Sequence, residues 1–191
     1  MEMKIVCILG SPRINGNSTT IARRFMSTAE SLGTETQIVA LNEISFRGCQ
    51  GCYACKTDLD RCVLEDDLTD VLEAVKIADM IVLATPVYGG HVTGQFKCFM
   101  DRTFSYLVPD YITNPQPSRL APGKKIVFII TQGSPIESTF ADIFPRYDER
   151  FKRSWRAAET HLIRACGLGP TGGVPNHFLR QAEEIARSIC V

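Results

Sequence analysis

Four of the eight cysteines in this 191-residue chain stand close together. They follow the pattern Cys49-x2-Cys52-x2-Cys55-x6-Cys62. Two successive x2 spacings allow three thiolates to converge on one small centre, and a short loop returns a fourth. Gly48 and Gly51 add the backbone freedom that such a loop needs. The pattern therefore predicts a thiolate-bound centre in a cysteine-rich loop at about residues 46–64.

Three kinds of centre fit these cysteines. An iron–sulfur cluster is favoured because bacterial ferredoxins space their cysteines in the same way. Arg47, Lys56 and Arg61 can offset the negative charge of the thiolates. Structural zinc sites usually have two well-separated cysteine pairs instead. Free thiols, or a redox dithiol at Cys52 and Cys55, are the third interpretation, although redox pairs start a helix and none is predicted here.

A second stretch with binding chemistry covers residues 10–19, between an apolar run and a predicted helix. Loop amides and a helix N-terminus direct their donors at one place, where the helix dipole favours an anion. The loop matches neither G-x-G-x-x-G nor G-x-x-x-x-G-K-[ST], which disfavours the usual dinucleotide and triphosphate sites. The alternative is a hydrophilic connection in which Ser18 caps the helix. The side chains that can bind a phosphate are Ser11, Arg13, Asn17, Ser18 and Thr19.

Composition limits the class of protein. The chain is 45% hydrophobic, which suffices for one α/β domain over residues 1–191. Its 21 basic and 21 acidic residues balance, so neither nucleic acid nor an anionic membrane is expected as a partner. The N-terminus lacks a signal-peptide pattern and no apolar run could span a bilayer, so we expect a cytoplasmic protein. In that reducing compartment a disulfide framework is not expected.

Strand and helix patterns alternate along the chain. Strands are predicted at residues 4–9, 36–41, 79–84 and 125–130, with a short, glycine-broken fifth strand within 169–175. Helices are predicted at residues 18–32, 67–78, 93–107 and 178–190, and over most of 140–167 with a break near Pro145. This alternation predicts a parallel sheet covered by helices on both faces, with right-handed crossovers.

Three loops rich in small or hydrogen-bonding residues follow predicted strands, at residues 10–18, 85–90 and 131–134. The carboxyl ends of parallel strands meet at one edge of the sheet, where such folds bind their ligands. We therefore expect the three loops to converge on one nucleotide-like cofactor.

The first two loops resemble those of a known family. The motifs that carry the resemblance are Gly10-Ser11-Pro12-Arg13 with Gly16-Asn17-Ser18, and Pro86-Val87-Tyr88-Gly89-Gly90 followed by Gly94-Gln95-Phe96-Lys97 and Asp101-Arg102. They resemble the phosphate loop, second flavin loop and following helix of NADPH-dependent FMN reductases, from about residue 3 to residue 102. This resemblance implies FMN and a flavodoxin-like three-layer sandwich, with a five-stranded parallel sheet in the order 2-1-3-4-5.

The resemblance also implies which residues hold FMN. Its phosphate would lie against Ser11, Arg13, Asn17, Ser18 and Thr19. Its isoalloxazine ring would be lined by Pro86, Val87, Tyr88, Gly89 and Gly90, with Thr131 and Gly133 in the third loop. Glycine amides can approach the flavin edge and stabilise negative charge on the reduced ring. No catalytic side chain is expected, because the cofactors carry the chemistry.

Together, the FMN loops and the cysteine run resemble the iron–sulfur flavoproteins. This implies a [4Fe-4S] cluster held by Cys49, Cys52, Cys55 and Cys62. It also implies a homodimer or homotetramer in which the cluster of one subunit lies near the FMN of another.

The expected function is electron transfer from a reduced donor, with NAD(P)H as a candidate, to a redox partner protein or a small-molecule acceptor. The alternatives are an NAD(P)H-dependent FMN or quinone reductase without a cluster, and a non-enzymatic flavodoxin-like electron carrier. A basic segment at residues 146–164 is expected to form a solvated face or a subunit contact, with a 2′-phosphate or acidic-partner site as the sharper interpretation. Trp155 within it is a candidate anchor of an oligomer interface.

Overall fold

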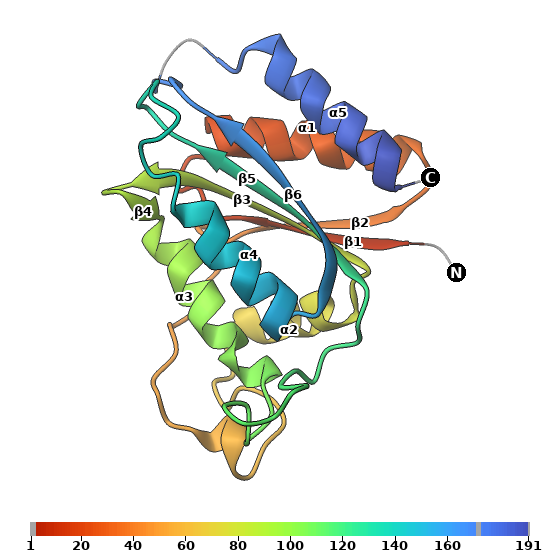
Figure 1. The fold of residues 1–191 in the computed structure, drawn as a ribbon, viewed down its shortest axis with the longest axis vertical. Coiled ribbons are helices and arrows are strands. Elements are labelled where there is room, and N and C mark those ends of the chain that lie inside the picture. Colours follow the sequence, from red (N-terminus) through yellow and green to blue (C-terminus); the bar gives the residue numbers. More distant parts are fainter. Residues whose placement is uncertain (1–2, 171–172, 191) are drawn as a thin grey trace.

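The computed structural model describes residues 3–170 and 173–190 (Figure 1). Its sheet contains β1 (Lys4–Leu9), β2 (Glu35–Ala40), β3 (Met80–Tyr88), β4 (His91–Val92), β5 (Lys124–Thr131) and β6 (Ala157–Ala165). The parallel strands lie in the order β2-β1-β3-β5-β6, and β4 pairs antiparallel with the end of β3. The predicted order 2-1-3-4-5 is therefore confirmed for the parallel strands, and the short strand β4 is the difference.

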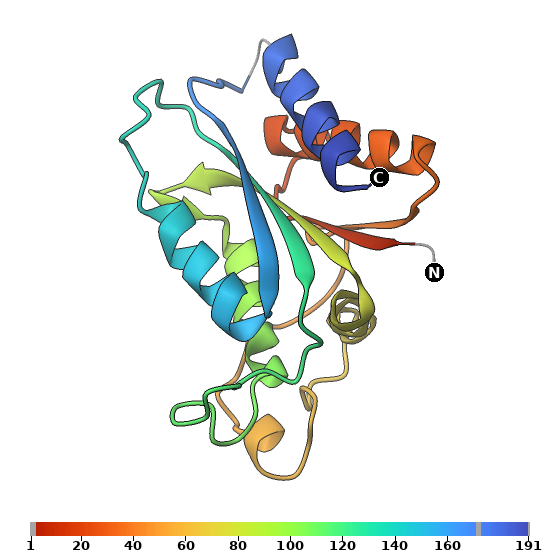
Figure 2. The same ribbon diagram turned by 45° about the vertical axis from the view of Figure 1, so that its right-hand side comes forward.

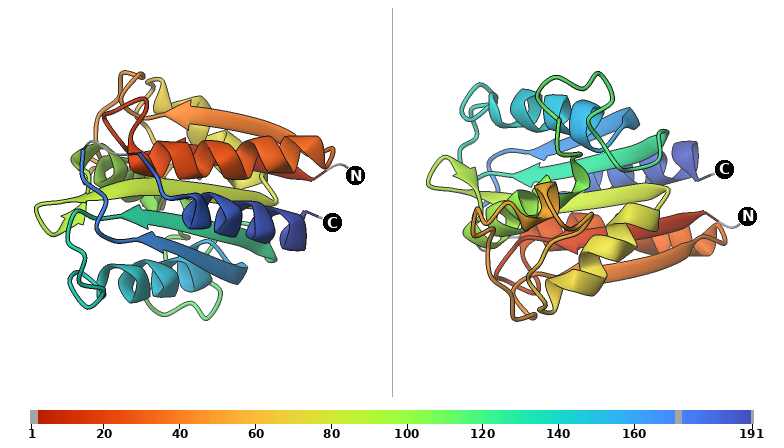
Figure 3. Two further views of the ribbon diagram at one scale, coloured as in Figure 1. Left: turned by 90° about the horizontal axis from the view of Figure 1, so that it is seen from above. Right: turned by 90° about the horizontal axis from the view of Figure 1, so that it is seen from below.

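Helices cover both faces of this sheet, as Figures 1 and 3 show. One face carries α1 (Asn17–Ser31) and α5 (Asn176–Ile189), and the other carries α2 (Leu68–Ile77), α3 (Gly94–Arg102) and α4 (Ile143–Ser154). Each face has its own apolar core, centred on residues such as Phe25 in one and Phe96 and Phe128 in the other. Because both faces are covered, β1 and β3 are apolar almost throughout. The flavodoxin-like three-layer prediction is confirmed.

Residues 140–167 differ most from the prediction. The expected long helix ends at Ser154, and residues 157–165 form the edge strand β6 instead. Only Ile163 and Ala165 are buried along β6, so the strand carries little apolar alternation, and residues such as Ala, Glu, Leu and Arg favour a helix locally. The fifth strand predicted within 169–175 is wrong for the described residues 169–170 and 173–175, whereas residues 171 and 172 lie outside the described residues.

Pro145 does not break α4. It is the third residue of the helix, where the backbone amide has no partner within the helix in any case. The helix predicted at 93–107 is divided, because α3 ends at Arg102 and a 3₁₀ turn, η2 (Thr103–Tyr106), follows it. In the described part of the chain, no helix combines the length and the apolar character needed to cross a bilayer.

Trp155 is not a surface residue. Its side chain is 0% exposed and packs against Phe151, with ring centroids 5.3 Å apart, and against Phe99 and Tyr106, each at 6.2 Å. It therefore belongs to the core beneath α4, and its predicted role as an oligomer anchor is wrong.

The position of β6 can be tested by a mild core substitution. We expect Ile163→Val to lower the free energy of unfolding by about 1 kcal/mol, because it removes one buried methyl group. Glu159→Gln, at an exposed position of the same strand, should change it by less than about 0.5 kcal/mol. Urea unfolding followed by circular dichroism measures both, and equal effects would contradict the burial of Ile163.

Candidate functional site

The three predicted ligand loops leave the sheet at neighbouring positions. Leu9 pairs with Ala84, and Pro86 pairs with Thr131, so β1, β3 and β5 end side by side. The amide of Gly10 donates to the Ala84 carbonyl at 2.7 Å, which fixes the start of the first loop against β3. The structure therefore brings the three loops to one edge of the sheet, as the sequence predicts.

The first loop ends at the N-terminus of α1. Gly16 is the N-cap, and no side chain caps the helix, so the alternative in which Ser18 is the cap is wrong. The first backbone bond of the helix runs from the Thr20 amide to the Gly16 carbonyl. The amides of residues 17, 18 and 19 have no hydrogen-bond partner among the described residues. They are the amides that a helix start offers to an anion.

Ser18 strengthens the case for a ligand at this position. The residue is 1% exposed, and its hydroxyl has no hydrogen-bond partner among the described residues. A buried hydroxyl left without a partner costs about 1–3 kcal/mol. The first turn of α1 contains no acidic residue that would repel an anion. The donor set thus fits a phosphate group.

The other predicted phosphate residues shape the same loop. Ser11 Oγ accepts from the Arg13 amide at 3.1 Å, and the hydroxyls of Ser11 and Thr19 donate to the Arg13 carbonyl at 3.2 and 3.4 Å. Asn17 Nδ2 donates to the Gly169 carbonyl at 3.0 Å, which ties the loop to the segment after β6. The Arg13 residue itself is exposed. A Cβ at Gly16 would lie 2.7 Å from Ser11 Oγ and 3.1 Å from the Arg13 carbonyl oxygen, so a larger residue would have to displace the Ser11 side chain.

The second loop is a tight hairpin between β3 and β4. Tyr88 pairs with His91, and the two residues between them, Gly89 and Gly90, have φ angles of 56° and 80°. Positive φ at both central positions is the geometry of a type I′ turn, which glycine adopts without strain. Pro86 is buried and Val87 is half-buried, whereas Tyr88 is 45% exposed. Tyr88 therefore offers its aromatic ring to the surface near the turn.

Thr93 joins these two loops, and the sequence interpretation missed it. Its Oγ1 donates to the Gly10 carbonyl at 2.6 Å and accepts from the Phe96 amide at the start of α3. Its own amide donates to Thr85 Oγ1 at 3.2 Å. A threonine directly before a helix is a known capping signal and could have identified this residue.

The Thr93 contacts lead to a stability prediction. We expect Thr93→Val to lower the free energy of unfolding by about 1–2 kcal/mol, because the valine keeps the volume but removes the cap and the bond to Gly10. Thr113→Val, at an exposed loop position, is the control and should be near neutral. Chemical unfolding of the flavin-free protein measures both variants. A neutral Thr93→Val would contradict the capping role.

The third loop follows β5 and leads to Phe140, which contacts the hairpin. Thr131 is buried and Gly133 is exposed. Between them, buried Gln132 accepts from Arg164 Nη2 at 2.9 Å. Phe140 has a φ of 64°. Its ring packs against Gly90, where an added Cβ would lie 3.3 Å from it. Arg164 ends the basic segment predicted at residues 146–164, but its contact with Gln132 was not predicted, because that segment was expected to be helical.

The cysteine loop lies away from this edge, at the lower end of the molecule in Figures 1 and 2. It turns at Gly51 and Tyr53, with φ angles of 63° and 59°, before a short 3₁₀ turn, η1 (Ala54–Lys56). Cys49 and Cys52 are exposed, Cys62 is half-buried and Cys55 is buried.

All four cysteines line one small cavity, together with Arg102 and Phe104. Among the described residues, no three His, Cys, Asp or Glu side chains gather closely enough to hold a single metal ion. The four cysteine residues thus share one cavity, although they are not gathered around a single point.

Positive charge lies beside this cavity. Of the three cations predicted for this role, Lys56 contacts a cysteine, with Nζ 3.4 Å from Cys55 Sγ. The same ammonium donates to the Phe104 and Leu107 carbonyls at 2.8 Å and lies 4.1 Å from the centre of the Phe104 ring. Burial lowers the pKa of Lys56, and the neighbouring Cys55 opposes that shift. The Arg47 and Arg61 residues are exposed.

Helix α3 connects the two regions. It starts two residues after β4 and ends at Arg102 on the cysteine cavity, so its nine residues span about 13 Å. The segment before the cysteines follows the same helix. Asn42 accepts from Gln95 at 3.0 Å, and Gly48 packs so closely on Cys98 that an added Cβ would lie 3.2 Å from its sulfur. The two candidate sites therefore occupy opposite ends of one helix.

Comparison with known proteins identifies the family of the chain. The sequence profile of the family described as NADPH-dependent FMN reductase matches residues 3–143. An iron–sulfur flavoprotein of Methanocaldococcus jannaschii is 39% identical over 101 residues, which cover 53% of this chain and 52% of that protein. An iron–sulfur flavoprotein of Methanosarcina thermophila is 38% identical over 101 residues, with the same coverage. The matched part spans about half the length of these relatives. The predicted resemblance is confirmed.

Solved structures agree on the fold. An FMN-dependent NADH-azoreductase from Bacillus anthracis has a TM-score of 0.73 at 14% identity, over 99% of this chain and 100% of that one. An NAD(P)H:quinone oxidoreductase from Methanothermobacter marburgensis has a TM-score of 0.71 at 16% identity, over 100% and 96% of the two chains. At these identities the likeness establishes the flavodoxin-like fold alone.

Proposed function

Because this chain belongs to the NADPH-dependent FMN reductase family, we propose that it is an electron-transferring flavoprotein with FMN at the three strand-end loops and a [4Fe-4S] cluster at the cysteine loop. Bound flavin exchanges electrons in pairs or singly and a cluster exchanges them one at a time, so the two together link pair donors to single-electron partners. The protein residues bind, orient and shield these groups.

The observation that carries the flavin site is the buried Ser18 hydroxyl without a partner, beside the open amides of α1. A phosphate would accept from both, and Ser11, Arg13, Asn17 and Thr19 would complete its surroundings. The isoalloxazine ring would lie against the hairpin residues 86–90, with Thr131 and Gly133 on the third loop. Tyr88 is exposed enough to lie beside that ring.

The chemistry of the donor set supports the cluster at Cys49, Cys52, Cys55 and Cys62. Four thiols share one cavity, and each can bind a separate iron of a [4Fe-4S] cluster. Structural zinc sites more often use two well-separated cysteine pairs, whereas Cys49, Cys52 and Cys55 follow one another at successive x2 spacings. The names of the similar archaeal proteins agree with a cluster.

We extend the proposal to a homodimer or homotetramer, in which the cysteine loop of one subunit meets the flavin site of another. Two exposed apolar side chains favour such a contact: Ile14 in the phosphate loop is 59% exposed, and Tyr53 in the cysteine loop is 57% exposed. We further propose one domain over residues 1–191 and a location in the reducing cytoplasm. The free state of all eight cysteines is consistent with that compartment.

Anaerobic turnover tests the proposed activity. We expect reduced nicotinamide dinucleotides to be oxidised in the presence of a quinone, and of a single-electron acceptor such as cytochrome c. Turnover of the quinone by protein without iron or sulfide would favour a cluster-free reductase. A flavin-loaded protein that is inert with both acceptors would favour an electron carrier.

A further inference from the structure

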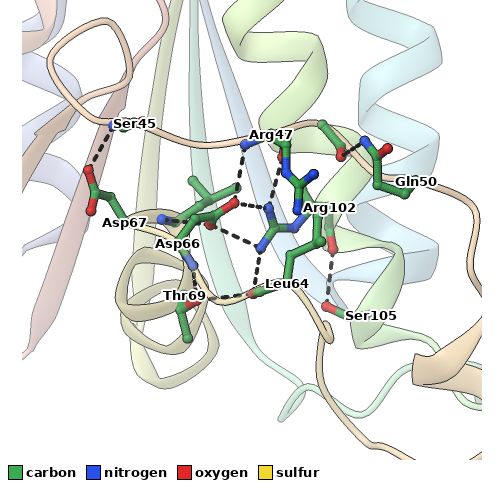
Figure 4. A network of polar contacts seen from close by, with 11 residues as sticks. Ser45, Arg47, Gln50, Leu64, Asp66, Asp67, Thr69, Arg102 and Ser105 are labelled. Carbon is green, nitrogen blue, oxygen red and sulfur yellow. Dashed lines mark hydrogen bonds and ion pairs between the residues drawn. The ribbon is translucent and has the colours of Figure 1, made fainter.

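One side chain, Arg102, holds both ends of the cysteine loop. It lies at the end of α3, and its side chain is 0% exposed. Its Nη1 donates to the Arg47 carbonyl at 2.8 Å, and its Nη2 donates to the Leu64 carbonyl at 3.1 Å (Figure 4). Arg47 stands two residues before Cys49, and Leu64 stands two residues after Cys62. A single guanidinium therefore closes the segment that carries all four cysteines.

Asp66 fixes the orientation of this guanidinium. Its carboxylate accepts from Nη1 at 2.7 Å and from Nη2 at 3.2 Å, which makes a two-pronged ion pair. The same carboxylate accepts from the amides of Arg47 at 3.2 Å and Leu68 at 3.1 Å. The position of Arg102 is thus set by both the loop and the start of α2.

These contacts use the Nη1 and Nη2 donors of Arg102 but leave its Nε–H donor free of them. Arg102 Nε is buried and has no hydrogen-bond partner among the described residues. A buried N–H without an acceptor is costly. Arg102 also lines the cavity of the four cysteines, where the acceptors are the cysteine sulfur atoms and the side-chain oxygens of Gln50, Tyr53 and Ser105. Burial lowers the pKa of Arg102, but Asp66 and Cys62 more than offset this, and Cys62 is the one cysteine that acts on the guanidinium among the described residues. The open donor and this contact together point to the sulfur at Cys62.

We infer that Arg102 is a positioning residue of the cysteine centre, which fastens both ends of the loop through Nη1 and Nη2 and presents its Nε–H and its charge to the sulfur at Cys62. This inference rests on the proposed cluster. Adding an electron to such a centre increases its negative charge, and a nearby cation with a hydrogen bond to sulfur stabilises that charge. Arg102 should therefore raise the reduction potential of the centre.

A pair of substitutions with opposite expected signs tests this role. Arg102→Gln removes the cation and should make the potential more negative. Asp66→Asn keeps Arg102 but removes the charge that neutralises it, and should make the potential more positive. Simple damage to the loop would instead shift both variants alike. Lys152→Gln removes an exposed cation on α4 and should leave the potential unchanged.

The potential is measured by a redox titration followed by electron paramagnetic resonance, on protein whose iron and sulfide have been counted. Trypsin cleavage after Lys56 and Arg61 reports separately on how firmly the loop is fastened. We expect at least tenfold faster cleavage in Arg102→Gln. Arg102→Lys should also be cleaved faster but should keep a potential closer to that of the wild type, because it retains the charge.

The inference would be overturned if Arg102→Gln kept the reduction potential and the cleavage rate of the wild type. It would also be overturned if Arg102→Gln and Asp66→Asn shifted the potential in the same direction. Wild-type protein without iron and sulfide would overturn the proposed cluster and, with it, the role of the Arg102 charge. The cleavage rates would then still decide whether Arg102 fastens the loop.

Discussion

Cys52→Ala should lose most of its iron and sulfide and keep its FMN. The cysteine cavity and the phosphate loop lie at opposite ends of α3, so removing one thiol leaves the flavin contacts unchanged. Three thiolates cannot complete a four-cysteine cluster site. We expect the cluster absorbance and the single-electron activity to fall at least tenfold, whereas the flavin spectrum persists.

Cys190→Ser is the matched control, because Cys190 follows α5 and lines no cavity with the four clustered cysteines. Its iron, sulfide and FMN contents should equal those of the wild type. Release of FMN from Cys52→Ala with unchanged metal content would show that the two loops have been assigned the wrong way round.

Ser18→Ala should bind FMN about 10- to 100-fold more weakly. A hydrogen bond to a charged group contributes about 1.5–3 kcal/mol, and the buried Ser18 hydroxyl has no other partner among the described residues. For the same reason, the flavin-free variant should be as stable as the wild type or more stable, by up to about 1 kcal/mol. The substitution should therefore weaken FMN binding without lowering the stability of the flavin-free protein.

Fluorescence titration of flavin-free protein measures the affinity, and urea unfolding measures the stability. Ser27→Ala is the control, because Ser27 lies on the exposed side of the same helix and its hydroxyl donates to the Arg24 carbonyl. Unchanged FMN affinity in Ser18→Ala, or a loss of stability without a loss of affinity, would contradict a phosphate at this position.

The central sheet and its ligand edge could be predicted because their signals are local. The strands β1, β3 and β5 are buried on both faces and carry continuous apolar runs, and the loops after them contain glycine, serine and threonine. A covered parallel sheet requires these runs, and its topology brings the loops together. The hairpin at Gly89 and Gly90 was predicted only as a loop, because β4 has just two residues.

The edge strand β6 could not be predicted in the same way. Most of its residues remain partly exposed, and their helical propensity was outweighed by pairing with β5, which no local pattern reveals. Trp155 was misjudged as a consequence, because the turn between α4 and β6 carries it into the core.

Arg102 illustrates a different limit. The cations predicted to lie near the cysteines are their neighbours in sequence, and one of them, Lys56, does contact Cys55. Arg102 lies forty residues after Cys62, and only the packing of α3 against the loop brings it to the cavity. Its partners were equally hidden, because two of them are backbone carbonyls, which leave no trace in the sequence.

Analysis of iron, acid-labile sulfide and FMN in anaerobically purified protein tests the central claim most directly. The proposed arrangement of the phosphate loop and the four cysteines predicts about four iron and four sulfide ions for each FMN. Protein that contains a full complement of FMN but neither iron nor sulfide would contradict it, and zinc in their place would identify the cysteine loop as a structural metal site.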